Sequence, residues 1–167
     1  MGMKLLKAWY HITALMKILA YKVMFGKKLT WGKQSTFRKY FSIYIEQDAQ
    51  IEVGNQCFFN HGCSINALKK VKIGDGCIFG ENVKIYDQNH RFADVQVAIK
   101  DQGFSVAEVT IGKHCWIGSN TVILKGVTIG DNCVIGAGCV ISEDIPSNSV
   151  VTGNRIVEIK ALRKKEN

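Results

Sequence analysis

The sequence predicts an all-β solenoid, in which short strands form the sides of a triangular coil and successive coils stack in parallel. Three features predict it: aliphatic residues recur every six positions, glycine often follows them directly, and a small or branched side chain stands four places later. A period of six fits neither a helix nor simple strand alternation. We expect a helical segment and connector over residues 1–44, the coil over 45–154 and a basic tail over 155–167.

The repeat is clearest in the second half of the chain. The longest unbroken series of leading residues, each six positions after the last, is Ile111, Ile117, Ile123, Ile129, Ile135 and Ile141. The same register runs upstream over 53–71 and 73–85, with slips of two residues. The phase is lost between Ile85 and Ile111, which predicts a loop insertion over 86–108. Three such sides give coils of about 18 residues, stacked at roughly 4.8 Å.

The cysteines follow the same repeat. All six occupy the fourth place after a leading residue: Cys57, Cys63, Cys77, Cys115, Cys133 and Cys139. Free cysteine behaves as a small, readily buried hydrophobic residue. We therefore expect these side chains to fill the inside of the prism, in a reducing cytoplasm. A disulfide framework or a metal cluster is the alternative, and the absence of CxxC spacing counts against it.

Residues 1–30 are predicted to be helical. Apolar residues recur there at spacings of three and four: Leu5, Trp9, Ile12, Leu15, Met16 and Leu19. Lysines interrupt this segment, so it lacks the run of about 20 apolar residues that a spanning helix needs. Two alternatives remain: the helix packs on the prism or helps form the acceptor site, or residues 1–25 lie on the inner face of a membrane. The connector over 31–44 carries Trp31 and Tyr40.

The net charge of +8 indicates an anionic partner. No nucleic-acid-binding module is recognisable in the sequence. A phosphate-bearing small molecule or a lipid surface is therefore the preferred partner, and no nucleic acid is expected.

Two segments resemble a known family, the hexapeptide-repeat acyltransferases. They are "IGKHCWIGSNTVILKGVTIGDNCVIGAGCVISEDIPSNSVVTGN" (111–154) and "NVKIYDQNHRF" (82–92). The sequence is most similar to the maltose and galactoside acetyltransferase branch and to the capsule or lipopolysaccharide sugar O-acetyltransferases, over roughly residues 45–154. The resemblance implies a left-handed parallel β-helix and a homotrimer with an active site in each groove between prisms. It also implies acetyl-CoA as cosubstrate along the prism wall, and no metal.

The resemblance implies three catalytic residues. His90, in the loop after Ile85, matches the family's general base, and imidazole suits proton removal from a sugar hydroxyl near neutral pH. Asn60 matches an asparagine near the acceptor, and Asp87 could orient the His90 ring. The alternatives are a solvated loop histidine, a plain corner residue and a surface carboxylate. His61 and His114 occupy turn positions and are interpreted as structural.

Cofactor contacts follow from the same resemblance. The tryptophan of the "WIGS" segment walls the pocket, and small residues let pantetheine approach the main chain; the matching positions are Trp116, Ser119, Ala137 and Ser142. Candidates for the CoA phosphates are Lys125, Arg155 and Lys160. The family commonly has "GNPAKVI" near this end, whereas this chain has arginine in place of the proline at position 155.

The function that we expect is transfer of an acetyl group from acetyl-CoA to a hydroxyl of a carbohydrate, such as a polysaccharide precursor. An amino sugar or an antibiotic as acceptor would use the same base and cosubstrate. A zinc carbonic anhydrase on the same prism would need three converging histidines, and the histidines of the coil lack the close pairing such enzymes carry. A non-catalytic scaffold would need no insertion with a histidine and no tryptophan-lined groove.

Overall fold

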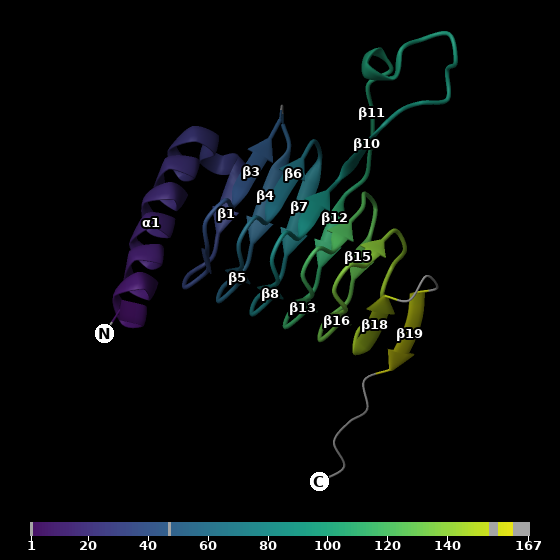
Figure 1. The fold of residues 1–167 in the computed structure, drawn as a ribbon. Coiled ribbons are helices and arrows are strands. Elements are labelled where there is room, and N and C mark those ends of the chain that lie inside the picture. Colours follow the sequence, from purple (N-terminus) through teal and green to yellow (C-terminus); the bar gives the residue numbers. More distant parts are fainter. Residues whose placement is uncertain (1, 47, 154–156, 162–167) are drawn as a thin grey trace.

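The computed structural model describes the backbone of residues 2–46, 48–153 and 157–161, and the side chains of residues 9–46 and 48–153. Figure 1 shows a stack of short strands with one helix lying across its first coil. The helix is α1 (Gly2–Phe25), followed by a 3-10 turn, η1 (Gly26–Lys28). The predicted helical segment over residues 1–30 therefore ends at Phe25, with a single further turn before the first strand.

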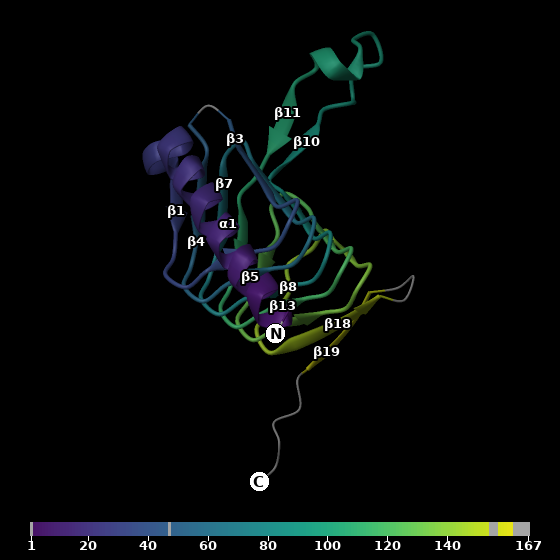
Figure 2. The same ribbon diagram turned by 60° about the vertical axis from the view of Figure 1, so that its left-hand side comes forward.

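The strands form three parallel faces, which we call A, B and C. Face A holds β1 (Leu29–Trp31), β4 (Gln50–Val53), β7 (Lys70–Ile73), β12 (Val109–Ile111) and β15 (Thr128–Ile129). Face B holds β2 (Thr36–Phe37), β5 (Phe58–Phe59), β8 (Ile78–Phe79), β13 (Trp116–Ile117), β16 (Val134–Ile135) and β18 (Ser149–Gly153). Face C holds β3 (Ser42–Ile45), β6 (Ser64–Ala67), β9 (Lys84–Tyr86), β14 (Val122–Ile123) and β17 (Val140–Ile141). The chain visits A, B and C in turn, and Figure 2 shows the resulting triangular outline. The predicted class, a left-handed parallel β-helix, is confirmed.

The leading residues of the repeat form the core. Ile73 pairs in register with Ile111, which pairs with Ile129 one coil further on, and all three side chains are buried. Phe59 and Phe79 stack with their ring centroids 4.4 Å apart. The six-residue period thus places one large apolar side chain at the same point of every coil, which gives a continuous core along the stack.

The coil begins earlier than residue 45. Strands β1–β3 pair in parallel with β4–β6, so the segment expected as a connector over 31–44 forms most of the first coil. Its leading residues are Trp31, Phe37 and Ile43, again six apart. Aromatic residues replace aliphatic ones at two of these positions, which hid the period. They fill the end of the prism, where the Phe37 and Phe41 rings stack at 4.4 Å.

All six cysteines are buried and free, which confirms their predicted structural role. Five of the thiols donate hydrogen bonds to main-chain carbonyls of the next coil: those of Cys57, Cys63, Cys77, Cys115 and Cys133. The Sγ–O distances are 3.1 Å from Cys57 to Gly74 and 3.0 Å from Cys77 to Gly112. The Thr121 hydroxyl likewise donates a hydrogen bond to the Gly136 carbonyl at 3.1 Å. The fourth position of the repeat therefore accepts a short side chain, and a donor there binds the neighbouring coil.

One face of α1 packs on the open end of the first coil, as the first of the two alternatives for this helix expects, and the opposite face stays exposed, so the second alternative is not decided by this packing. Ala14 and Ile18 are buried, and Tyr21 packs against the core. Lys17 donates its ammonium group to the carbonyl of Phe41. Along the described part of the chain, no helix is both long and apolar enough to cross a bilayer.

Two further strand pairs leave the regular pattern. The predicted loop insertion contains β10 (Gln88–His90), the 3-10 turn η2 (Ile99–Asp101) and β11 (Phe104–Val106). β10 and β11 pair antiparallel and project from the prism as an arm, which Figures 1 and 2 both show. In the tail, β19 (Val157–Ala161) pairs antiparallel with β18.

Candidate active site

The arm carries His90 at the corner between faces C and A, which we call the CA corner. His90 is the last residue of β10 and pairs with Phe104 of β11. The two rings lie 4.4 Å apart at 41°. The His90 side chain is exposed, so its imidazole is accessible to a substrate. The antiparallel pairing and the ring contact hold this side chain in place beside the prism.

Asp87 is buried at the base of the arm, with no exposed surface. Its two carboxylate oxygens accept hydrogen bonds from the main-chain N–H groups of Leu68 (2.8 Å) and Lys69 (2.7 Å). Within the described residues it makes no hydrogen bond to His90. The expected orienting role, and the alternative of a surface carboxylate, are therefore replaced by a structural one. Asp87 fixes the point where the arm leaves the coil.

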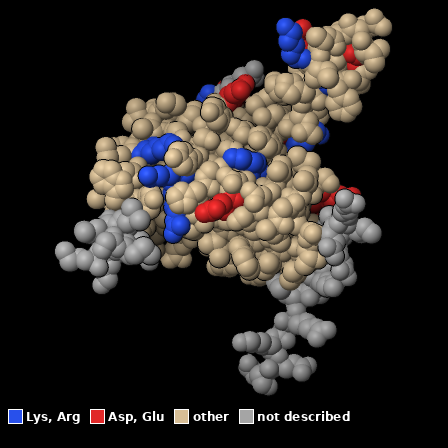
Figure 3. All heavy atoms as spheres, viewed as in Figure 1, with Lys and Arg blue, Asp and Glu red and all other residues tan. Residues whose placement is uncertain are grey.

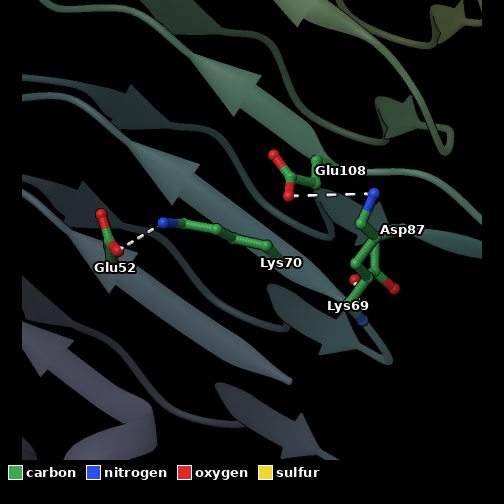
Figure 4. A network of polar contacts seen from close by, with 5 residues as sticks. All are labelled: Glu52, Lys69, Lys70, Asp87 and Glu108. Atoms are coloured by element: carbon green, nitrogen blue, oxygen red, sulfur yellow. Dashed lines mark hydrogen bonds and ion pairs between the residues drawn. The ribbon is translucent and has the colours of Figure 1, made fainter. Parts of the chain in front are cut away.

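Figure 4 shows one ion pair next to Asp87 and a second that extends away from it. Lys69 lies 3.9 Å from Glu108, and Lys70 on face A lies 2.7 Å from Glu52. The first pair is about half exposed, so screening by water leaves it little energy. The hydrogen bonds to the buried Asp87 carboxylate are the stronger constraint, because they satisfy a group that has no access to water.

A hollow of about 670 Å³ opens beside His90. Arg91, Asp101 and Ser105 from the arm line it, together with Lys125 from the next coil. The arm and this coil are joined by the Gly126 N–H, which donates to the Ala107 carbonyl at 3.2 Å. Lys125, expected near the CoA phosphates, therefore lies on the His90 side of the prism.

Asn60 lies at the corner between faces B and C, which we call the BC corner. It follows β5, and its main-chain N–H donates to the Phe79 carbonyl at 3.0 Å. Its side-chain oxygen accepts hydrogen bonds from the N–H of His61 (3.0 Å) and from Arg38 Nη1 (3.3 Å). A plain corner residue would account for the hydrogen bond from the His61 N–H. The contact with Arg38 goes further, because it places a cation beside the Asn60 amide.

Trp116 and the small residues belong to face B and the BC corner. Trp116 lies on β13 with 54% of its surface exposed. Ser119 and Ala137 lie at the same corner, one coil apart. The N–H of Gly138, the residue after Ala137, donates a hydrogen bond to the Ser119 carbonyl at 2.8 Å. The Ser119 hydroxyl accepts from the Glu81 N–H at 3.0 Å. The predicted alignment of these residues along one wall is thus found in the structure.

The candidate residues therefore fall into two groups on one chain. His90, Lys125 and the exposed Ser142 lie at or near the CA corner. Asn60, Ser119 and Ala137 lie at the BC corner, with Trp116 on the adjoining face B. The width of face C separates the two corners. A single chain does not bring the expected base and the expected acceptor asparagine together.

Two candidates lie beyond what the structure describes. Arg155 is outside the described residues, and Lys160 lies in β19, but its side chain is not described. The phosphate contacts expected there stay predictions.

The structure adds two residues that the sequence interpretation missed. Arg38 contacts Asn60 as described, and its guanidinium lies 5.5 Å from the centre of the Phe58 ring. Its position 22 residues before Asn60, about one coil, is the signal that could have found it. Gln88 lies two residues before His90, and its buried Oε1 has no hydrogen-bond donor among the described residues. Alternate residues of a strand share a side, so this oxygen faces the same side of β10 as His90.

Metal ligation has no support in the geometry of this region. Among the residues that the structure describes, no group of three or more His, Cys, Asp or Glu side chains is placed to hold a metal ion. The six thiols lie inside the prism at other points. The chemistry available at the two corners is that of an imidazole, amides, hydroxyls and basic side chains.

Comparison with known proteins gives the class to which this prism belongs. Residues 108–143 match the family model described as bacterial transferase hexapeptide (six repeats). Nodulation protein L of Rhizobium meliloti is 44% identical over 105 residues, which cover 62% of this chain and 56% of that protein. A maltose O-acetyltransferase from Clostridium difficile superposes with a TM-score of 0.68 at 34% identity, over 81% of this chain and 70% of the other.

A third similarity is to a structure with a bound cosubstrate. A hexapeptide-repeat acetyltransferase from Vibrio cholerae, solved in complex with acetyl-CoA, superposes with a TM-score of 0.70 at 26% identity, over 81% of this chain and 72% of the other. The chain belongs to the hexapeptide-repeat transferase family. It spans little more than half the length of the first curated relative.

Proposed function

We propose that this protein is an acetyl-CoA-dependent O-acetyltransferase that modifies a hydroxyl of a sugar or of a polysaccharide precursor. The single observation that carries the proposal is the exposed His90 imidazole, held on an arm beside a hollow that also contains Lys125. The activities of similar proteins support it, since one is a maltose O-acetyltransferase and another was solved in complex with acetyl-CoA.

The proposed chemistry is direct transfer within a ternary complex. The His90 imidazole takes the proton from the acceptor hydroxyl as its oxygen attacks the thioester carbonyl carbon. The carbon–sulfur bond then breaks, and the CoA thiolate leaves with the proton from the imidazolium. Holding the two substrates side by side removes the need for an acyl-enzyme. A main-chain N–H would stabilise the developing oxyanion.

The active form is proposed to be a homotrimer with a site in each groove between prisms. The separation of His90 from Asn60 supports this, because the CA corner of one chain and the BC corner of another can face each other across such a groove. Each groove would then contain one imidazole, one asparagine, and the exposed Trp116 with the small residues Ser119 and Ala137. Acetyl-CoA would lie along this wall, with Lys125 available to its phosphates.

The deciding experiment compares the parent protein with His90→Ala. The variant should lose acetyl transfer from acetyl-CoA to a panel of sugars and glycan fragments, by at least about 100-fold, because a general base contributes that much or more. Binding of CoA, measured by calorimetry, should persist. His114→Asn is the matched control: His114 is a turn residue with φ of 56°, a conformation that asparagine accepts. Activity of His90→Ala within tenfold of the parent would refute the assignment.

The acceptor hydroxyl is proposed over an amino group on similarity alone, since both use the same base. The screen should therefore include amino sugars and aminoglycosides. Arg38 favours an acceptor that carries a negative charge, because its guanidinium lies 3.3 Å from the Asn60 side-chain oxygen.

A further inference from the structure

α1 has an apolar face that the prism does not cover. Its inner side packs on the first coil through Ala14 and Ile18. Its outer side carries a stripe of large apolar side chains at alternating spacings of three and four residues. These side chains are exposed by 53–80%: Trp9, Ile12, Met16, Leu19 and Val23. We call them the outer stripe. A contiguous exposed apolar surface of this kind marks an interaction site.

The segment that carries the outer stripe is strongly basic. Residues 1–45 contain nine Lys and Arg residues and no Asp or Glu, and the first acidic residue of the chain is Glu46. These nine charges exceed the net charge of the whole chain, which is +8. The remaining residues are therefore close to neutral. On the face shown in Figure 3, Lys and Arg side chains gather toward the α1 end of the prism.

We propose that the outer stripe docks on an anionic lipid surface, with α1 lying in the plane of the membrane. Apolar side chains of such a helix enter the boundary between headgroups and acyl chains, while nearby Lys and Arg attract anionic headgroups. Lys22 and Lys27 are exposed and can supply this charge, one from the last turn of α1 and the other from the 3-10 turn that follows. The helix does not cross the bilayer, in keeping with its composition.

Charge selects a membrane over a second copy of the chain. Two outer stripes packed together would bring two basic segments into contact, each without a single carboxylate to form an ion pair. Like charges across an interface oppose association. An anionic bilayer supplies the missing negative charge as well as the apolar layer, so it fits both features of the segment.

The position of α1 makes this docking compatible with the proposed site. α1 lies across the end of the stack, whereas the arm with His90 leaves from the side (Figure 1). In the proposed trimer, on which this step rests, parallel prisms would present three outer stripes at one end. Three weak contacts made together bind far more tightly than one. The grooves would stand perpendicular to the membrane with their contents accessible.

The test is co-sedimentation of the full-length protein with lipid vesicles. The parent should bind vesicles of phosphatidylcholine with phosphatidylglycerol, bind pure phosphatidylcholine weakly, and lose binding as salt rises. The double variant Ile12→Glu with Leu19→Glu should bind at least about tenfold more weakly, because it places carboxylates in the apolar layer. Val95→Glu is the matched control, since Val95 is 89% exposed on the arm, away from α1.

Three outcomes would overturn the proposal. They are failure of the parent to bind the anionic vesicles, binding of the double variant as tight as that of the parent, and formation by the parent of a larger assembly without lipid that the double variant does not form. The last result would identify a second copy as the partner. Circular dichroism and elution volume establish that the variants fold. Acetyl transfer to a water-soluble sugar is measured separately, so failure of the proposed activity is distinguishable from failure of docking.

Discussion

At the scale of single residues, the glycines after the leading positions are set by close contact between coils. A Cβ added at Gly118 would lie 2.5 Å from the Ala137 nitrogen, 2.7 Å from the Gly136 carbonyl carbon and 2.8 Å from the Ile135 oxygen. All three are main-chain atoms, so neither coil can yield without losing strand pairing. Glycine therefore recurs at this position because adjacent coils stack too closely for a Cβ, and not because the position needs a positive φ angle.

Gly118→Ala should lower the free energy of unfolding by roughly 1–3 kcal/mol, the usual cost of overpacking. Chemical denaturation measures it. Gly138→Asn is the control: Gly138 has φ of +74° with nothing within 4 Å of an added Cβ, and the nearby Asn120 and Asn132 adopt the same conformation. This control should stay within about 0.5 kcal/mol of the parent. Equal losses in both variants would contradict the contact argument.

Asp87 gives a second prediction at this scale. Asp87→Asn replaces one acceptor with an NH₂ group facing the Leu68 or Lys69 N–H, so one buried hydrogen bond is lost. We expect the free energy of unfolding to fall by about 1–3 kcal/mol. The Leu68 and Lys69 amide hydrogens should also exchange faster with deuterium. Asp94→Asn, at an exposed carboxylate of the arm, should change neither quantity. Unchanged exchange at Leu68 and Lys69 would refute the structural role.

Site residues were predicted unevenly, and Asp87 shows why. The resemblance predicts His90 and Asn60, because each matches a position in a family motif, and both stay predictions. The hydrogen-bond partners of a carboxylate depend on which groups an adjacent coil places beside it. No pattern along the chain encodes this arrangement. Asp87 lies three residues before His90 but bonds to residues almost one coil earlier. Arg38 was missed for the same reason, since its contact with Asn60 spans a coil.

At the scale of elements, all six cysteines share one position of the repeat, and at this position the side chain is buried inside the prism. Their burial leaves no thiol accessible, and burial raises the pKa of the Cys63 thiol to about 11 from an ordinary value of 9.0. In the native protein we expect no reaction with iodoacetamide at neutral pH, and reaction of all six thiols after unfolding. Val95→Cys, on the exposed arm, should react at once and serves as the control.

The raised pKa of Cys63 also predicts a pH dependence of stability. The folded state binds the thiol proton more tightly than the unfolded state, so the contribution is complete below pH 9.0 and is lost as the pH rises toward 11. Urea midpoints should therefore fall across this range. Cys63→Val should show a shallower fall, since valine already occupies this slot at Val83 and Val127. An unchanged slope in this variant would contradict the assignment to Cys63.

The first coil shows where a period search fails. Trp31, Phe37 and Ile43 keep the six-residue spacing, but aromatic side chains replace the aliphatic ones and only Gly32 follows in the expected place. Packing explains the substitution. The end of the prism has no preceding coil, so larger rings and α1 close it, with Trp31 contacting Phe41 at 5.7 Å between ring centres. The sequence predicted both the helix and the coil. It did not predict where the coil begins, because the first coil is packed with the aromatic side chains that close the end of the prism.

At the scale of the whole molecule, the sequence predicted one continuous prism but not how its corners meet those of other chains. The six-residue period dictates which side chains point inward, since each coil buries the same positions. It says nothing about which outer edges become neighbours after assembly. The two corners that carry the candidate residues are separated by face C, so the arrangement of the site depends on the proposed trimer. This dependence can be measured directly.

Two inactive variants should restore activity when they share a trimer. His90→Ala keeps an intact BC corner and Asn60→Ala keeps an intact CA corner, so a groove formed by one of each can contain both native residues. Random mixing of equal amounts should give about a quarter of the parent's activity, because each groove draws its two corners independently from two chains; purified mixed trimers should give about a third, because each has one intact groove of three. Co-expression with two affinity tags, followed by tandem purification, isolates the mixed trimers. If the two residues served one site within a chain, every mixed trimer would stay inactive.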